Sequence, residues 1–220
     1  MRFKKKEPLD VNFADNLNLY LHTGVMALKK ISQVPIDVYR SVFDVHSGVQ
    51  VEYYRSKGIQ YAENGRYDKA VAFLNVASEE IPNDVEILYY LGLSYIKTGD
   101  QEQGLTALEE GLKLDGNSVP VLALLGMTYS KQKKYEKAIQ VLGKAVSLEK
   151  KDANLFYRLG FAYDNMKNHE KAVQCFQKAM AIDPDNIKVC QALGLAYESM
   201  GNRDEAVKYF KQALELEEEV

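Results

Sequence analysis

The small and hydrophobic positions of this chain recur with a fixed spacing of 34 residues. Stepping by 34 from Gly160 reaches a glycine every time, at Gly24, Gly58, Gly92, Gly126 and Gly194. The cleanest copy of the unit spans residues 153–186. A period of this length predicts stacked structural repeats, each of which buries its apolar face against its neighbours.

Each copy contains two amphipathic patterns with helical spacing, which predict a pair of helices called A and B below. Five regular copies follow one another without insertion: 51–84, 85–118, 119–152, 153–186 and 187–220. Within each copy a turn is expected around Gly65, Gly99, Lys133, Lys167 or Gly201. The glycine column of helix A alternates with large side chains of helix B such as Leu142 and Phe176, so we expect the two helices to approach closely. Pro82 and Pro184 should end helix B in their copies, because the residue before a proline disfavours helical backbone.

The first 50 residues depart from the regular pattern. Residues 17–50 keep Tyr20 and Gly24 in register, but Ile36 and Phe43 replace small residues, so we interpret this stretch as a degenerate repeat that packs differently. Residues 1–16 carry a short basic run, Lys4 to Lys6, and are expected to form a mobile tail. Attraction of this tail to an anionic membrane surface is the alternative.

Composition excludes several functional classes. A net charge of −3 argues against a general nucleic-acid binder. The only cysteines, Cys175 and Cys190, are too few for a disulfide framework, and Cys190 is expected to be a small buried hydrophobe. No histidine has a metal-ligand neighbour, and no nucleophile, base and orienting group stand together. We therefore expect no enzyme activity, cofactor, metal site or membrane-spanning segment.

The repeat columns identify the family. Leu-Gly at positions seven and eight, Tyr at eleven, Ala at twenty, an aromatic or Leu at twenty-four and Ala at twenty-seven resemble the tetratricopeptide repeat (TPR). The family's leading Trp is replaced by Tyr54, Leu88, Leu122, Phe156 and Cys190. The resemblance implies an all-α fold: a right-handed, hook-shaped superhelix of five regular repeats plus the degenerate one, with helix A lining a concave groove.

That resemblance also indicates which residues would face a partner. Position nine forms an apolar ladder, Ile59, Leu93, Met127, Phe161 and Leu195, and nearby lie Tyr89, Tyr90 and Tyr157 together with the cations Arg55, Arg158 and Lys188. An exposed stripe of this kind suits an amphipathic partner helix that carries carboxylates. The alternative is that part of the ladder is buried between A helices. The Lys and Asn pairs with which TPR co-chaperones clamp an acidic C-terminus are missing.

The repeat 85–118 is unusual in its glycines. Gly104 and Gly111 occupy both small columns of helix B, and Gly116 replaces a closing proline. Glycine inside a helix costs roughly 1 kcal/mol relative to alanine. We therefore predict a flexible hinge in this repeat, with close packing as the alternative.

The non-consensus residues carry a closer resemblance. Leu19-Tyr20, Lys29-Lys30 and Tyr53-Tyr54-Arg55, with Lys97-Thr98-Gly99 and Arg158-Leu159-Gly160 further on, are similar to a TPR family of the magnetosome, an organelle of magnetotactic bacteria. This resemblance implies a cytoplasmic, peripheral protein of the magnetosome membrane that self-assembles and recruits other magnetosome membrane proteins. It also implies that the degenerate repeat 17–50 engages the groove of a neighbouring copy. The residues concerned are Leu17, Leu19, Tyr20, Leu21, Val25, Met26 and Leu28. A monomeric adaptor that binds a foreign apolar or amphipathic peptide is the alternative, and a regulatory subunit of an enzyme is a more remote one.

Overall fold

A computed structural model describes residues 47–218 of the protein, with side chains from residue 51 onward. These residues form ten α-helices and, within that range, no strand. The chain divides into two compact units, one ending at Thr98 and the other beginning at Gly99. The expected all-α TPR architecture of paired helices is confirmed, and the division between the units falls inside the repeat 85–118.

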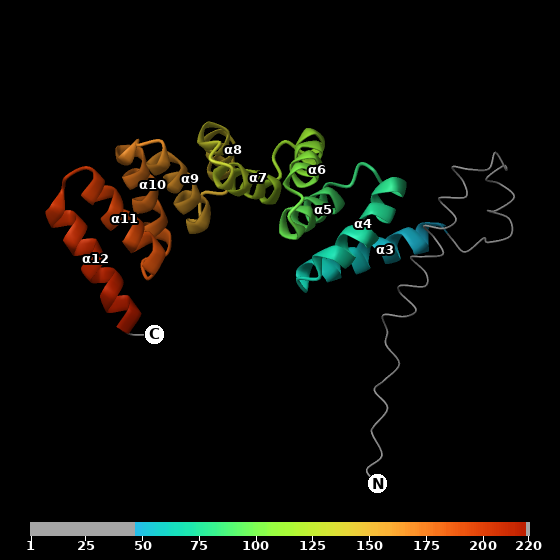
Figure 1. Ribbon diagram of the computed structural model, residues 1–220, viewed down its shortest axis with the longest axis horizontal. Coiled ribbons are helices and arrows are strands. Elements are labelled where there is room, and N and C mark those ends of the chain that lie inside the picture. The colour runs from blue at the N-terminus through green and yellow to red at the C-terminus, as the bar shows by residue number, and fades with distance from the viewer. Residues whose placement is uncertain (1–46, 219–220) are drawn as a thin grey trace, which may run out of the picture. The chain divides into compact units, whose positions relative to one another are not determined.

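The first unit contains three described helices (Figure 1): α3 (Ser47–Glu63), α4 (Tyr67–Glu80) and α5 (Val85–Thr98). All three contact one another. Phe73 is 1% exposed, and its ring lies 5.7 Å from the Tyr54 ring and 5.2 Å from the Tyr61 ring. Aromatic residues therefore fill the core between α3 and α4 in this unit.

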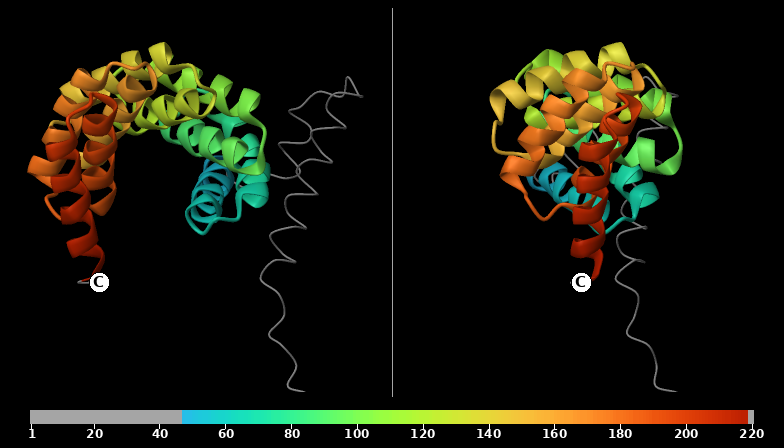
Figure 2. Two further views of the ribbon diagram at one scale, coloured as in Figure 1. Left: turned by 60° about the vertical axis from the view of Figure 1, so that its left-hand side comes forward. Right: turned by 90° about the vertical axis from the view of Figure 1, so that its left-hand side faces the viewer.

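The second unit contains α6 (Gln101–Leu114), α7 (Val119–Lys131), α8 (Tyr135–Leu148), α9 (Ala153–Asn165), α10 (His169–Ile182), α11 (Ile187–Ser199) and α12 (Arg203–Glu218). Each helix packs against the next one in the chain, and the A helices α7, α9 and α11 also contact one another in that order. Figure 2 shows α12 as the last helix of this succession. Contacts confined to one repeat and its neighbours are what a stacked-repeat architecture requires.

Helices A and B approach closely at the glycine column. A Cβ atom added to Gly58 would lie 2.5 Å from the Leu74 side chain, and one added to Gly160 would lie 2.6 Å from the Phe176 ring. The same relation holds for Gly126 with Leu142 at 2.4 Å and for Gly194 with Phe210 at 2.5 Å. The predicted alternation of small and large residues is therefore confirmed as a close contact, in which a side chain on helix A would overlap one of helix B.

The turns between helices A and B all contain one residue in the left-handed region. Its φ is 71° at Gly65, 102° at Gly99 and 78° at Gly201, and 58° at both Lys133 and Lys167. These are the five predicted turn positions. Two repeats thus place a lysine where glycine would adopt the backbone conformation without steric cost. Helices α4 and α10 end at Glu80 and Ile182, before Pro82 and Pro184 as expected.

The tyrosine column of helix A connects consecutive repeats through hydrogen bonds to the residue 20 positions earlier. The Tyr95 hydroxyl donates to Oδ1 of the Asn75 side chain at 3.1 Å and accepts from its Nδ2 at 2.9 Å. The Tyr129 hydroxyl donates to Glu109 at 2.7 Å, and the Tyr197 hydroxyl accepts from Gln177 at 3.1 Å. Another tyrosine of this column, Tyr163, has Gly143 as its counterpart 20 positions earlier, a residue without a side chain to bond.

Candidate partner-binding surface

The apolar ladder of the second unit is exposed on two consecutive A helices. Phe161 on α9 is 44% exposed and Leu195 on α11 is 55% exposed, while Met127 on α7 is half-buried. A repeat core hides its apolar residues, so two large apolar side chains at equivalent exposed positions indicate a surface rather than a packing role. The alternative, burial of part of the ladder between A helices, does not apply to Phe161 or Leu195.

Two cations accompany these apolar side chains. Arg158 precedes Phe161 by three positions on α9, and Lys188 precedes Leu195 by seven positions on α11. Residues three, four or seven apart share one side of a helix. Arg158 is half-buried and Lys188 is exposed, and neither makes an ion pair with another residue of the described chain. Both cations are therefore available to a carboxylate from outside the unit.

Tyr157 has a different role from its neighbours. It packs against the core cluster of α9, α10 and α11, and its ring lies 5.8 Å from the buried Phe176 ring. The sequence prediction grouped Tyr157 with Phe161 among the residues that would face a partner. The structure revises that expectation: truncating Tyr157 removes a core contact, so only Phe161 tests the surface cleanly.

The ladder in the first unit is less exposed. Ile59 on α3 and Leu93 on α5 are both half-buried. Tyr89 and Tyr90 on α5 stack edge to face with ring centroids 5.1 Å apart, and the Tyr90 hydroxyl donates to Glu63 at 3.2 Å. Burial raises the pKa of Tyr89, and burial followed by the bond to Glu63 raises that of Tyr90. Both phenols therefore stay neutral at physiological pH.

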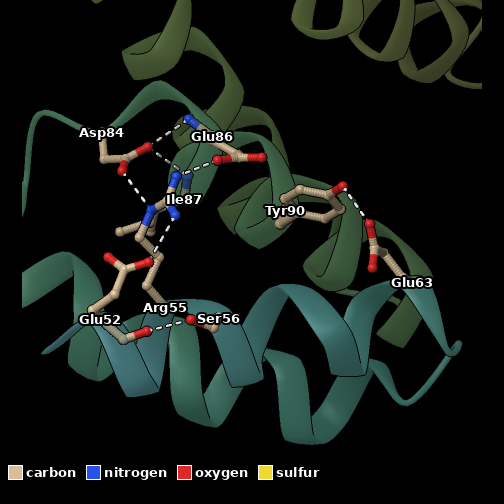
Figure 3. A network of polar contacts seen from close by, with 8 residues as sticks. All are labelled: Glu52, Arg55, Ser56, Glu63, Asp84, Glu86, Ile87 and Tyr90. Atoms are coloured by element: carbon tan, nitrogen blue, oxygen red, sulfur yellow. Dashed lines mark hydrogen bonds and ion pairs between the residues drawn. The ribbon is translucent and has the colours of Figure 1, made fainter. Parts of the chain in front are cut away.

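Arg55 lies at the centre of an ion-pair network between α3 and the start of α5 (Figure 3). Its Nε donates to Asp84 at 2.9 Å and its Nη1 to Glu52 at 3.2 Å, while Nη2 contacts Glu86. The sequence prediction placed Arg55 among the cations that would hold a ligand carboxylate. The guanidinium is instead paired with carboxylates of its own chain, so its role is to join α3 to α5.

Asp84 has a second function in this network, as the cap of α5. Its Oδ1 accepts from the backbone N–H of Glu86 at 2.8 Å and from that of Ile87 at 3.1 Å. Burial by itself raises the pKa of the Asp84 carboxyl, but the bonds from the Ile87 N–H and the Arg55 guanidinium outweigh it and lower the pKa overall. In turn, the bond to Asp84 raises the pKa of Arg55 despite partial burial. Sequence reasoning missed this capping pair, although an Asp immediately before helix A was a visible signal.

No group of three His, Cys, Asp or Glu residues in the described range is arranged to hold a metal ion. Cys175 and Cys190 are buried free thiols, and burial is the largest cause of the raised pKa of each, which agrees with the structural role predicted for Cys190. Among residues 47–218, every helix is too short or too polar to cross a bilayer.

Two predicted features stay predictions. The self-assembly residues Leu17 to Leu28 and the basic tail lie outside the described residues. Of the hinge glycines, Gly104 and Gly111 are buried within α6 and Gly116 is half-buried after it.

Models of the TPR match three parts of the chain, residues 126–167, 153–186 and 187–220. A model described as anaphase-promoting complex subunit 3 matches residues 63–145. The chain is 38% identical over 80 residues to magnetosome protein MamA of Magnetospirillum gryphiswaldense, and 35% identical over 85 residues to that of Paramagnetospirillum magneticum. These stretches cover 36% and 39% of this chain, and only 37% and 38% of those relatives.

Solved structures extend the similarity over most of the chain. A structure of MamA AMB-1 is 36% identical, with a TM-score of 0.69, and the match covers 76% of this chain and 99% of that one. A structure of a MamA RS-1 double mutant is 30% identical with a TM-score of 0.74, covering 77% and 96%. Both sequence and fold are thus shared over nearly the whole length of these structures.

Proposed function

The chain belongs to the MamA family of tetratricopeptide repeat proteins, and we propose that it is a non-enzymatic scaffold that binds other proteins at the magnetosome. The relatives are named magnetosome proteins, which supports this location. We further propose that the protein associates peripherally with the cytosolic face of the magnetosome membrane. There its exposed A-helix side would recruit partner proteins.

The exposure of Phe161 and Leu195 carries this proposal. The two side chains stand at equivalent positions of α9 and α11, which contact each other. Packed helices lie about 8–10 Å apart, so an amphipathic helix laid across them would cover both apolar groups at once. Arg158 and Lys188 would receive carboxylates at the edge of such a helix. The expected ligand is therefore an apolar helix with acidic flanks.

The first occupant that we propose is the degenerate repeat of a second copy. Its apolar residues, from Leu17 to Leu28, have helical spacing and follow Asp15, so they match the apolar and one acidic part of the expected ligand, whereas Lys29 and Lys30 at the other end are basic. One copy would offer this segment and the next would offer its A-helix side. A contact between two different surfaces does not close on itself, so it can extend an assembly without a fixed size.

Sedimentation velocity tests the assembly. We expect the full chain to sediment as a large species, and a variant lacking residues 1–46, which keeps α3 intact, as no more than a dimer. Phe161→Ser in the full chain should also dissociate the assembly, because it removes the exposed apolar contact without touching the core. Leu148→Ser is the matched control, since Leu148 is 43% exposed on α8, a B helix.

Two results would contradict the proposal. A full chain that remains monomeric at high concentration would favour the monomeric adaptor, in which the same surface binds only foreign peptides. Equal effects of Phe161→Ser and Leu148→Ser would show that the A-helix side has no special role.

A further inference from the structure

The outward face of α12 carries a stripe that the proposed assembly does not use. Arg203, Val207, Lys211, Leu214 and Glu218 follow one another at intervals of four, four, three and four residues, which places them on one side of the helix. Val207 is 66% exposed and Leu214 is 60% exposed. They are the two most exposed large hydrophobic side chains of the described chain.

Comparison with α10 shows what this face does elsewhere in the unit. The residues 34 positions earlier are Val173 and Met180. Val173 is 7% exposed, and both pack against the core cluster to which α11 contributes Val189 and Leu193. On α10 this face is therefore covered by the A helix that follows it, α11. No helix among the described residues follows α12, whose place at the edge of the unit is visible in Figures 1 and 2.

The charges at the two ends of the stripe make these ends complementary to each other. A cation, Arg203, lies at its start and an anion, Glu218, at its end. Neither forms an ion pair with another described residue. If a second α12 packs against the first in the opposite direction, Arg203 meets Glu218 of the other copy at both ends, and Val207 meets Leu214. A parallel arrangement would place Arg203 against Arg203 instead.

Lys211 lies near the midpoint of this antiparallel arrangement. Its Nζ is 3.7 Å from Glu215 of its own helix, so its charge is directed to the side of the apolar contact and partly balanced there. The aliphatic part of the lysine can then cover the apolar pair while its ammonium stays in water. The centre of the stripe is therefore compatible with close approach of two copies.

We propose that α12 is a symmetric contact site for a second copy of this chain, formed by antiparallel pairing of two α12 helices about a two-fold axis near Lys211. The same patch serves both partners, which is the rule for a two-fold interface. This contact is independent of the proposed assembly through residues 17–50. Together the two contacts would connect neighbouring linear assemblies, since the contact through residues 17–50 extends a row of copies and the α12 contact links two such rows.

Cysteine crosslinking of the full chain tests the symmetry. With 1.5 Å of rise per residue, two copies of residue 211 are offset along the axis by about 1.5 Å, and two copies of residue 207 by about 10 Å. A disulfide requires Cα atoms about 4.4–6.8 Å apart. On mild oxidation we expect Lys211→Cys to give mostly disulfide-linked dimer, and Val207→Cys at least five-fold less. The double variant Val207→Cys/Leu214→Cys should again crosslink efficiently, through residues 207 and 214 of different copies.

Charge reversal separates a specific contact from random collision. In the Lys211→Cys background, Arg203→Glu should reduce the dimer yield several-fold, and adding Glu218→Arg should restore it. The buried Cys175 and Cys190 contribute no crosslink, which peptide mapping of the linked product would verify.

The outcomes distinguish this contact from the proposed assembly. In a chain that carries both Phe161→Ser and Lys211→Cys, the disulfide-linked dimer should still form even though the large assembly is lost. Loss of the crosslink in that variant would refute an independent contact. Equal crosslinking of Lys211→Cys and Val207→Cys, or none for either, would refute the two-fold arrangement. Absence of the crosslink from both variants is expected if residues 17–50 of another copy, or a foreign protein, cover α12.

Discussion

Replacing Gly160 by alanine should destabilise the protein, although alanine is the better helix former. The new Cβ would lie 2.6, 2.7 and 3.1 Å from three atoms of the Phe176 ring, against about 3.5–4.0 Å for an ordinary carbon contact. Phe176 is 2% exposed, so its ring cannot withdraw into solvent. Overpacking of a core costs about 1–3 kcal/mol, whereas the gain in helix propensity is about 1 kcal/mol. We expect a net loss of about 1–2 kcal/mol because the overlap with an enclosed ring is severe.

Gly143→Ala is the matched control for this effect. Gly143 lies inside α8, and a Cβ added there meets no other atom within 4 Å. It should therefore show the propensity gain alone and stabilise the protein by up to about 1 kcal/mol. Urea unfolding followed by far-ultraviolet circular dichroism, at a concentration low enough to suppress assembly, measures both changes.

The sign of the difference is the decisive result. If Gly160→Ala were as stabilising as Gly143→Ala, helices α9 and α10 could not be as close as the structure places them. A further check is the Phe176→Ala background, in which the ring is gone. There Gly160→Ala should become neutral or stabilising, and an unchanged penalty would show that the ring is not its cause.

Two further predictions concern titratable groups. Asp84→Ala should cost about 1–2 kcal/mol at pH 7, more than Arg55→Met, because it removes both the cap of α5 and the partly exposed ion pair. Since folding lowers the pKa of Asp84, its contribution to stability is present above the unfolded pKa and should disappear as the pH falls through the folded pKa. Urea unfolding as a function of pH would measure this loss. Burial, with the bond to Glu109, raises the pKa of Tyr129 to about 12. The free energy of unfolding should therefore fall as the pH rises from about 10, where an unfolded tyrosine ionises, towards that value. Tyr129→Phe should weaken this fall, and the ultraviolet absorbance of tyrosinate would report the delayed ionisation.

The sequence predicted the repeat contacts well because each is local and recurs. Gly160 and Phe176 lie 16 residues apart inside one unit, so their columns predict their contact wherever the unit is repeated. The turn at Lys167 was located for the same reason, since its position in the repeat outweighed the poor suitability of lysine for a positive φ. Periodicity thus carries information that a single segment does not.

The candidate surface was predicted less completely because its residues depend on pairings that no column records. The repeat frame places Arg55 on the partner side, but only the three-dimensional approach of Asp84 shows that its charge is already paired. Tyr157 and Phe161 lie four residues apart on the same helix, yet the first packs against the Phe176 ring and the second is 44% exposed. The open face of α12 could not be seen from its own sequence, because the same column is covered in α10.

The tyrosine hydrogen bonds between repeats also bear on how the protein unfolds. In a repeat protein the coupling between neighbours decides whether repeats melt together or separately. Within the second unit the boundary before α7 has the bond from Tyr129 to Glu109 and the boundary before α11 has that between Tyr197 and Gln177, whereas Gly143 leaves Tyr163 without this bond at the boundary before α9. The coupling between α8 and α9 therefore depends on side-chain packing at this column, whereas the other two boundaries add a hydrogen bond to theirs.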